Sequence, residues 1–410
     1  MRNDNNQYVK ELSRKLDLLS VFSRISQDKV FHAFGQCIYR YAEVPEEQEE
    51  FHANFCGALY NLAETDNWTE YLTQIVLSLE NPCAVFAAKG KKLPVYLEEA
   101  ARTDLRILSE FAAVTPETLA EEEDLDLLPR WHAEPVDLET AYFAWISEIH
   151  RHGYGDYALY KMFCMEQEQN AESGFVLKPV KYPDAVQLQD LIGYEFQKNQ
   201  VIANTKALLK GLKASNILLY GDAGTGKSAT VKAVANAYAD EGLRLIELSK
   251  NELHLLPKLL EELSENPLKF ILFIDDLSFQ ENDDDFSALK AVLEGSICAR
   301  LHNTVIYATS NRRHIVRETF SQRAGDEVHR NDTIQETISL SERFGIQILY
   351  EKPDKNLYLE IVCNLAKQYH LEIPPEQLVM EAERFALRKG GRSARSARQL
   401  VEQLCAKQKI

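Results

Sequence analysis

The sequence of 410 residues lacks the features that mark secreted, membrane and zinc-binding chains. No two of its seven cysteines are closer than 19 residues, so neither a CxxC pair nor a zinc-knuckle spacing exists. The N-terminus has no apolar signal-peptide core, and no apolar run approaches the length of a membrane span. We therefore expect free thiols in a reducing compartment, a cytoplasmic location and no membrane contact.

Basic residues are also scarce: 46 Lys and Arg stand against 63 Asp and Glu, a net charge of −17. This balance argues against a surface built throughout for nucleic acid or anionic lipid. Residues 1–180 hold 16 basic and 31 acidic side chains, whereas residues 181–410 hold 30 and 32. Such a break predicts two functional parts, with the seam in the Gly- and Pro-containing stretch 173–183.

The first part, residues 1–180, is predicted to be an all-α acidic domain. Apolar residues recur at three- and four-residue spacing, with helices expected over 47–62, 68–79, 94–110 and 138–150. The acidic run Glu121–Asp124 is interpreted as a solvated loop or a helix start rather than a binding face. No catalytic constellation occurs here, so the role of this part stays open.

A phosphate-binding motif dominates the second part. The apolar run 216–220 is typical of a buried parallel strand, and an Ala-rich helical stretch begins at 229. Between them the chain matches G-x-x-x-x-G-K-[ST] over Gly221, Asp222, Ala223, Gly224, Thr225, Gly226, Lys227 and Ser228. The glycines let backbone N–H groups surround a phosphate, Lys227 supplies charge to the β- and γ-phosphates, and Ser228 offers a hydroxyl to Mg²⁺.

Two further strand ends carry polar side chains. The apolar run 270–274 ends in Asp275 and Asp276, which we expect at the carboxyl edge of a parallel sheet, where ligands bind. Asp275 is the candidate Mg²⁺-side carboxylate, and Asp276 is the candidate that polarises the attacking water. The run 304–308 ends in Thr309-Ser310-Asn311, and Asn311 is the candidate that orients that water.

Together these motifs resemble an AAA+ ATPase module, with Walker A at 221–228, Walker B at 271–276 and sensor one at Asn311. The segment 341–345 resembles the arginine-finger segment, and 391–399 resembles sensor two. Several stretches, among them 190–195, 307–314 and 340–345, are similar to a bacterial family of predicted AAA+ ATP-binding proteins known as a domain of unknown function. The resemblance covers about residues 185–405.

The resemblance implies roles for arginines and one departure from the superfamily pattern. Arg343 would reach the γ-phosphate of a neighbouring subunit, with Arg323 and Arg330 as weaker alternatives. Arg395 is preferred for sensor two over Arg392 and Arg398. The usual second acid of Walker B is Glu, and the shorter Asp276 predicts slow or partner-dependent hydrolysis, because water positioning fails from displacements of about 1 Å.

We thus predict a doubly wound P-loop α/β domain over 185–351, a helical lid over 352–410 and the helical domain before them. The expected cofactors are ATP and Mg²⁺. The leading hypothesis is an oligomeric ATPase with shared sites that remodels a protein or nucleoprotein partner bound through residues 1–180. The alternatives are an ATP-gated binding module and, more weakly, a nucleic-acid loader. A metabolic kinase would need no sensor or finger segments, so Asn311, Arg343 and Arg395 argue against it.

Overall fold

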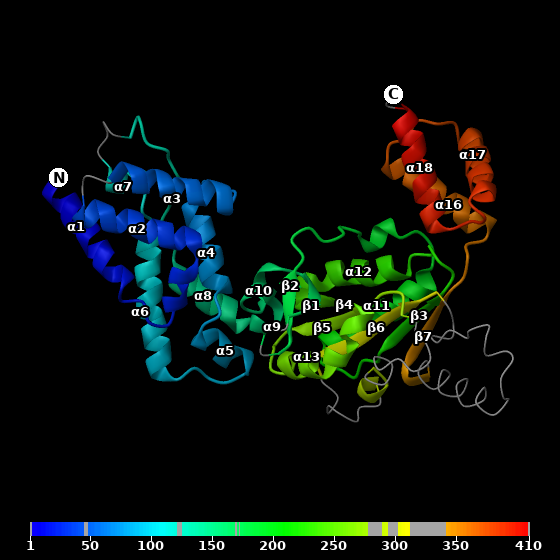
Figure 1. Ribbon diagram of the computed structural model, residues 1–410, viewed down its shortest axis with the longest axis horizontal. Coiled ribbons are helices and arrows are strands. Elements are labelled where there is room, and N and C mark those ends of the chain that lie inside the picture. The colour runs from blue at the N-terminus through cyan, green and yellow to red at the C-terminus, as the bar shows by residue number, and fades with distance from the viewer. Residues whose placement is uncertain are drawn as a thin grey trace. The chain divides into compact units, whose positions relative to one another are not determined.

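The computed structural model describes residues 2–44, 48–120, 125–168, 170–171, 173–277, 289–293, 302–311 and 342–408. The chain divides into two compact units, Met1–Leu159 and Tyr160–Ile410 (Figure 1). Among the described residues, no helix combines the length and apolar character that a bilayer span requires. The predictions for Glu121–Asp124, Arg323 and Arg330 concern residues outside the described ranges.

The first unit is helical, as the periodicity predicts. Side-chain caps begin several of its helices: Asp28 accepts the backbone N–H groups of Val30 and Phe31, and Asn67 accepts that of Glu70. Its helices are α1 (Arg2–Leu16), η1 (Ser23–Gln27), α2 (Lys29–Glu43), α3 (Gln48–Leu62), α4 (Trp68–Ser78), α5 (Pro82–Ala88), α6 (Val95–Ala112), α7 (Pro116–Leu119), α8 (Leu138–Ser147), α9 (Ile149–His152) and α10 (Asp156–Leu159).

An aromatic cluster holds these helices together. Trp68 is fully buried, and its ring lies 4.5 Å from that of Phe34, centroid to centroid. Its indole Nε1 donates to the carbonyl of Phe111 at 2.8 Å, so the polar edge of the ring is also satisfied. The buried carboxylate of Asp104 also connects two segments of this unit, because it accepts the backbone N–H groups of residues 20–22.

The second unit is built on a seven-stranded sheet in the order β2-β1-β4-β5-β6-β3-β7. Every pairing is parallel except that of β1 with β2. The last five strands in chain order have the spatial order 5-1-4-3-2 of a doubly wound sheet. The strands are β1 (Met162–Gln167), β2 (Phe175–Pro179), β3 (Ile217–Gly221), β4 (Leu243–Leu248), β5 (Lys269–Ile274), β6 (Thr304–Ser310) and β7 (Ile346–Tyr350).

The position of β1 and β2 corrects the expected domain boundary. Residues 162–179 were expected in the helical domain, but β1 pairs with β4 and so belongs to the sheet. The Gly- and Pro-containing stretch 173–183 that suggested a linker contains β2, and in the turn before β2 the Glu168 N–H donates to the Gly174 carbonyl. The two units therefore divide at Leu159, about twenty residues before the predicted seam.

Helices cover both faces of the sheet, so its central strands are buried on both sides. Helix α12 (Lys227–Tyr238) lies on one side and α13 (Leu256–Leu263) on the other (Figure 1). Helix α11 (Glu195–Leu209) packs with α12 in the same apolar cluster. Short turns η3 (Leu188–Asp190) and η4 (Ala239–Glu241) lie against α12, and η5 (Lys250–Leu255) lies against α13. The predicted α/β fold class is confirmed.

Three helices follow the sheet, within the range 352–410 for which a helical lid is predicted. They are α16 (Lys355–Gln368), α17 (Pro375–Arg388) and α18 (Ala394–Gln408), and they share their own apolar core. Asp354 caps α16, and Pro375 occupies the first turn of α17, where its missing N–H costs no hydrogen bond. Gly390 and Gly391 have positive φ angles and turn the chain into α18.

Candidate nucleotide-binding site

The phosphate loop joins β3 to α12 at the carboxyl edge of the sheet. Gly221 has φ +125°, and a side chain there would begin 2.2 Å from the carbonyl oxygen of Tyr350 on β7. Gly224 and Gly226 also have positive φ angles, of +77° and +99°. A side chain at Gly221 would therefore collide with β7, and the positive φ angles of Gly224 and Gly226 favour glycine in a loop that leads into the N-terminus of α12.

Lys227 is buried in this loop and holds it closed. Its Nζ donates to the carbonyls of Gly221 at 3.0 Å and Asp222 at 2.7 Å, and to Asn311 Oδ1 at 3.3 Å. Burial lowers the pKa of Lys227, although the nearby Asp222, Asp275 and Asp276 act in the opposite direction. The Lys227 ammonium, which has three N–H donors, thus links the end of β3 to the residue that follows β6.

Asp275, immediately after β5, faces the loop. Ser228 Oγ donates to Asp275 Oδ1 at 2.6 Å, which brings together the two side chains predicted to lie beside a metal ion. Thr309 Oγ1, at the end of β6, donates to the same carboxylate oxygen and accepts the N–H of Asp276 at 2.9 Å. Thr309 is buried and fixes both acids relative to the sheet.

Asp276 has a left-handed backbone conformation, with φ +50°, which only a minority of non-glycine residues adopt. Asn311 Nδ2 donates to Asp276 Oδ1 at 2.7 Å. Asn311 therefore bridges two predicted site residues, accepting from Lys227 and donating to Asp276. The exposed carboxylate of Asp276 is therefore held in place by the Asn311 amide.

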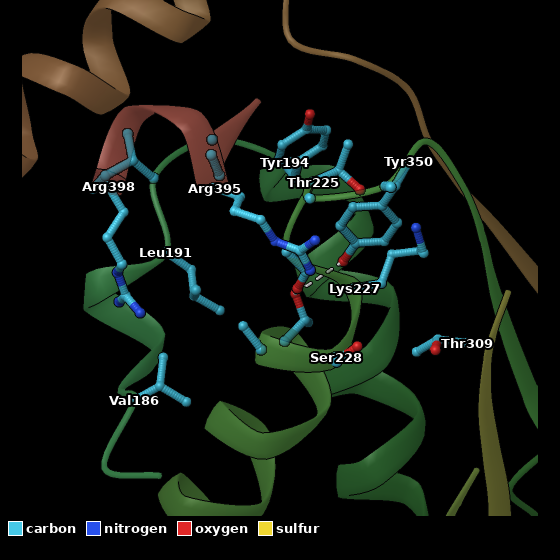
Figure 2. A pocket seen from close by; sticks show the side chains of 18 of the residues that line it. Val186, Leu191, Tyr194, Thr225, Lys227, Ser228, Thr309, Tyr350, Arg395 and Arg398 are labelled. Carbon is cyan, nitrogen blue, oxygen red and sulfur yellow. Dashed lines mark hydrogen bonds between the residues drawn. The ribbon is translucent and has the colours of Figure 1, made fainter. Parts of the chain in front are cut away.

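A cavity of about 480 Å³ lies over the loop, within the size range of small-molecule sites. Figure 2 shows Lys227, Ser228 and Thr309 on one side and Arg395 and Arg398 reaching in from α18. Apolar side chains form another part of its wall; they are Val186, Leu191, Ile192, Ile361 and Leu365. The cavity thus combines a cationic, loop-lined end with an apolar end, as a nucleotide requires.

The structure separates the three arginines considered for sensor two. Arg395 and Arg398 line the cavity, and the Arg395 N–H donates to the Gly224 carbonyl at 3.2 Å, which ties α18 to the phosphate loop. Arg392 instead forms a two-point ion pair with Glu383, at 3.2 and 2.8 Å. Arg395 and Arg398 are thus placed to meet an anion in the cavity, and Arg392 is engaged within the lid.

Not every predicted site residue lines the cavity. Gly221 and Asp222 anchor the loop: Asp222 N–H donates to Tyr350 O at 3.0 Å, and its carboxylate accepts Lys352 N–H at 3.0 Å. Arg343 is half-buried just before β7 and is not among the described residues that line the cavity. Its predicted role requires a second subunit, so its position within one chain leaves that prediction standing.

Sequence reasoning overlooked Thr309 and the apolar wall. Thr309 directly follows the apolar run 304–308, and a hydroxyl at that position was the available signal. The wall residues are contributed by a segment before α11 and by α16, far apart in sequence, and no spacing pattern links them. Tyr194 and Tyr350 stack there with ring centroids 5.1 Å apart.

The oxygen atoms beside the phosphate loop fit a hard divalent cation that takes its other ligands from a bound molecule. Within the described ranges, no group of three His, Cys, Asp or Glu side chains could hold a metal by itself. Ser228 and Asp275 offer one hydroxyl and one carboxylate, and Mg²⁺ is commonly bound by one or two protein oxygens together with substrate phosphates. Such a cation would therefore depend on a nucleotide for its remaining ligands.

The strand order, the phosphate loop before α12 and the helical lid define a P-loop protein of the AAA+ class. The chain belongs to the family described as "Protein of unknown function (DUF815)", whose sequence profile matches residues 160–408. That profile begins one residue after the first unit ends.

Comparison with solved structures finds the RuvB Holliday junction branch migration motor of Thermotoga maritima, with a TM-score of 0.38 and 18% identity over 53% of this chain. A variant of the same motor gives a TM-score of 0.37 and 17% identity, also over 53% of this chain. Both alignments cover 63% of the motor, so this chain spans less than two thirds of its length. No curated protein sequence matches the chain.

Proposed function

We propose that this protein binds ATP with Mg²⁺ and hydrolyses it slowly. The observation that carries the proposal is two series of hydrogen-bonded side chains at the carboxyl edge of the sheet. One joins Ser228, Asp275 and Thr309, and the other joins Lys227, Asn311 and Asp276. These are the oxygen, cation and amide groups that phosphoryl transfer to water requires, held beside a cavity of nucleotide size.

Each residue would then change partner when the cavity fills. Lys227 would exchange its two carbonyl acceptors for phosphate oxygens, which releases Asn311 Oδ1. Asn311 would be free to orient a water molecule, and Asp276 to accept a proton from it. Bound Mg²⁺ would supply charge neutralisation beside Ser228 and Asp275, and Arg395 would stabilise the phosphate charge from the lid.

We further propose that the active form is a homo-oligomer with shared sites. Arg343 lies outside the cavity of its own chain, which is the placement expected of a residue that completes a neighbour's site. Hydrolysis would be coupled to remodelling of a protein or nucleoprotein partner, with the acidic first unit selecting that partner. The shorter reach of Asp276 makes turnover dependent on assembly or partner.

Steady-state ATP hydrolysis, measured across protein concentrations, tests this proposal. Specific activity should rise with concentration, and Lys227→Ala and Asp276→Asn should abolish it. Arg343→Ala should remove the concentration dependence. A specific activity that is constant with concentration and unchanged in Arg343→Ala would contradict the shared site, and absence of ATP binding by the wild type would contradict the whole proposal.

The contact between Asn311 and Asp276 favours a second candidate, an ATP-gated binding module with little hydrolysis. At 2.7 Å the amide occupies the carboxylate oxygen that would activate water. If this contact persists with ATP bound, nucleotide would position the lid without being consumed. Single-turnover hydrolysis decides between the two, because fast cleavage that is lost in Asp276→Asn excludes the module.

A further inference from the structure

The connection between β7 and the lid is short and stiff. Residues 351–354 lie between the end of β7 and the start of α16. Pro353 has a fixed φ angle and restricts Lys352 before it to an extended conformation. Asp354 caps α16 by accepting the backbone N–H of Leu357 at 2.8 Å. Because the connection has so little freedom, the position of Lys352 sets where α16, and with it the lid, begins.

The phosphate loop holds this connection through Asp222. The Asp222 carboxylate accepts the Lys352 backbone N–H at 3.0 Å, and the Asp222 N–H donates to the Tyr350 carbonyl at 3.0 Å. These two bonds reach the chain on both sides of Glu351, whose carbonyl accepts the Tyr194 hydroxyl at 2.6 Å. A hydrogen bond from a backbone N–H to an ionised carboxylate is stronger than one between neutral groups. Asp222 therefore attaches the start of the lid to the loop.

The first turn of α18 contacts the same loop at a second point. The Arg395 backbone N–H donates to the Gly224 carbonyl at 3.2 Å. A side chain at Gly224 would begin 3.1 Å from Arg395 Cβ and 3.3 Å from Ser393 Oγ, so this turn is packed against the loop. From there the Arg395 side chain extends into the cavity (Figure 2). Since α16 and α18 share one apolar core, the place where α16 begins also determines where Arg395 lies.

We propose that Asp222 is a positioning residue: by holding Lys352 it fixes the lid so that Arg395 reaches phosphates bound by the loop. The inference rests on the proposed nucleotide binding and adds how the loop places this arginine. Asp222 is not among the described residues that line the cavity, so its carboxylate acts on a nucleotide through other residues. A lid that is not held at Lys352 places Arg395 less uniformly, and the affinity gained from a preorganised cation is then lost.

A double-mutant cycle between Asp222 and Arg395 tests this in the full chain, with Mg-ATP affinity measured by titration calorimetry. Asp222→Ala removes the acceptor, and Asp222→Asn keeps one. Lys352→Pro breaks the same bond from the other side and leaves the loop sequence intact, because proline has no backbone N–H. Asp240→Ala is the matched control, an exposed aspartate that is not among the described residues lining the cavity.

Arg395→Ala should weaken Mg-ATP binding about tenfold in the wild type, in Asp222→Asn and in Asp240→Ala. In Asp222→Ala and in Lys352→Pro the same substitution should weaken binding less than about threefold, because Arg395 is no longer held in place. An equal effect of Arg395→Ala in all five backgrounds would mean that Asp222 only supports the loop, and it overturns the proposal. So does an Arg395→Ala substitution without effect in the wild type.

Hydrogen exchange in the ligand-free chain separates this proposal from that of nucleotide binding. The Arg395 amide should exchange at least about tenfold faster in Asp222→Ala and Lys352→Pro than in the wild type, because its bond to Gly224 depends on the lid position. Unchanged protection of the paired strands β4 and β5 shows that the sheet of each variant is folded. Wild-type protein that does not bind Mg-ATP contradicts the proposed function, and the Arg395 exchange then decides the placement alone. Unchanged exchange in both variants overturns the placement.

Discussion

The two units of this protein place their hydrogen-bonded polar groups differently, in the buried core of the first unit and at an open sheet edge of the second. In Met1–Leu159 the buried carboxylate of Asp104 is fully engaged by backbone N–H groups, and the indole of Trp68 is capped by a carbonyl. In Tyr160–Ile410 the polar side chains gather at one sheet edge and bond to each other beside a cavity. The first pattern fixes a fold, whereas the second holds groups that a ligand can recruit.

The balance of basic and acidic residues also differs between the two units. Residues 1–159 carry 14 basic and 28 acidic side chains, and residues 160–410 carry 32 and 35. The acidic excess therefore belongs to the unit without a nucleotide cavity and outside the matched family region. We propose that nucleotide chemistry and partner choice are separate properties of the two units. All three tryptophans, Trp68, Trp131 and Trp145, lie in the first unit, so their fluorescence reports on that unit alone.

The largest expected effect is a loss of stability in the first unit that leaves the second unit unchanged. Trp68→Ala removes a fully buried indole and its hydrogen bond, and should lower the free energy of unfolding of the first unit by about 3–5 kcal/mol. Chemical denaturation followed by the remaining tryptophans measures it. Tyr96→Ala, at a 72% exposed aromatic, is the control. Loss of ATP affinity in Trp68→Ala would show that the units are not independent.

The converse change acts on the second unit. Lys227→Ala removes the ammonium that gathers the loop carbonyls and should weaken Mg-ATP binding at least about 100-fold, because charge-assisted bonds to phosphate are lost. Calorimetric titration measures the affinity, with exposed Lys213→Ala as control. Tryptophan-detected unfolding should be the same as in wild type. A shifted unfolding curve would contradict the separation of the units.

The motifs of the second unit could be predicted from the sequence better than its β1–β2 hairpin, because the residues of each motif are contiguous. The phosphate loop, the acids after β5 and the lid helices that are separated by Pro374-Pro375 and Gly390-Gly391 are local patterns. The hairpin of β1 and β2 was misassigned, because a short apolar strand beside a polar turn has no periodicity to identify it. Its place in the sheet comes from pairing with β4, some eighty residues later.

Other roles depend on contacts between distant residues. Thr309 acts through Asp275 and Asp276, 34 and 33 positions away, and Asp104 acts through residues 20–22, more than 80 positions away. Nothing in the local sequence of either residue distinguishes it from an ordinary strand threonine or helix aspartate. The choice between Arg392 and Arg395 likewise depended on Glu383, which lies on the neighbouring helix.

A smaller effect tests whether the two acids need their shared support. Thr309→Val keeps the shape and the strand preference but removes the hydroxyl that joins Asp275 to the Asp276 N–H. We expect about a tenfold loss of hydrolysis with little loss of ATP affinity, since misplacement of a catalytic group affects the transition state most. Thr304→Val, at the start of the same strand, is the control. Equal activity of the two variants would remove Thr309 from the site.

The smallest effect returns to the first unit and its response to acid. His52 is fully buried, with Nδ1 3.1 Å from the Tyr41 hydroxyl and Nε2 2.8 Å from the Pro129 carbonyl. Burial lowers the pKa of His52 below the ordinary value of 6.5, against a smaller opposing effect of the Pro129 carbonyl. The unfolded chain therefore binds this proton more readily, so the stability gained from neutral His52 is present above pH 6.5 and is lost as the pH falls through the lowered pKa.

Tryptophan-detected Tm should drop by roughly a few degrees on acidification, and His52→Gln should reduce that drop whereas exposed His32→Gln should not. An identical acid response in both variants would assign the sensitivity of this unit to its carboxylates instead.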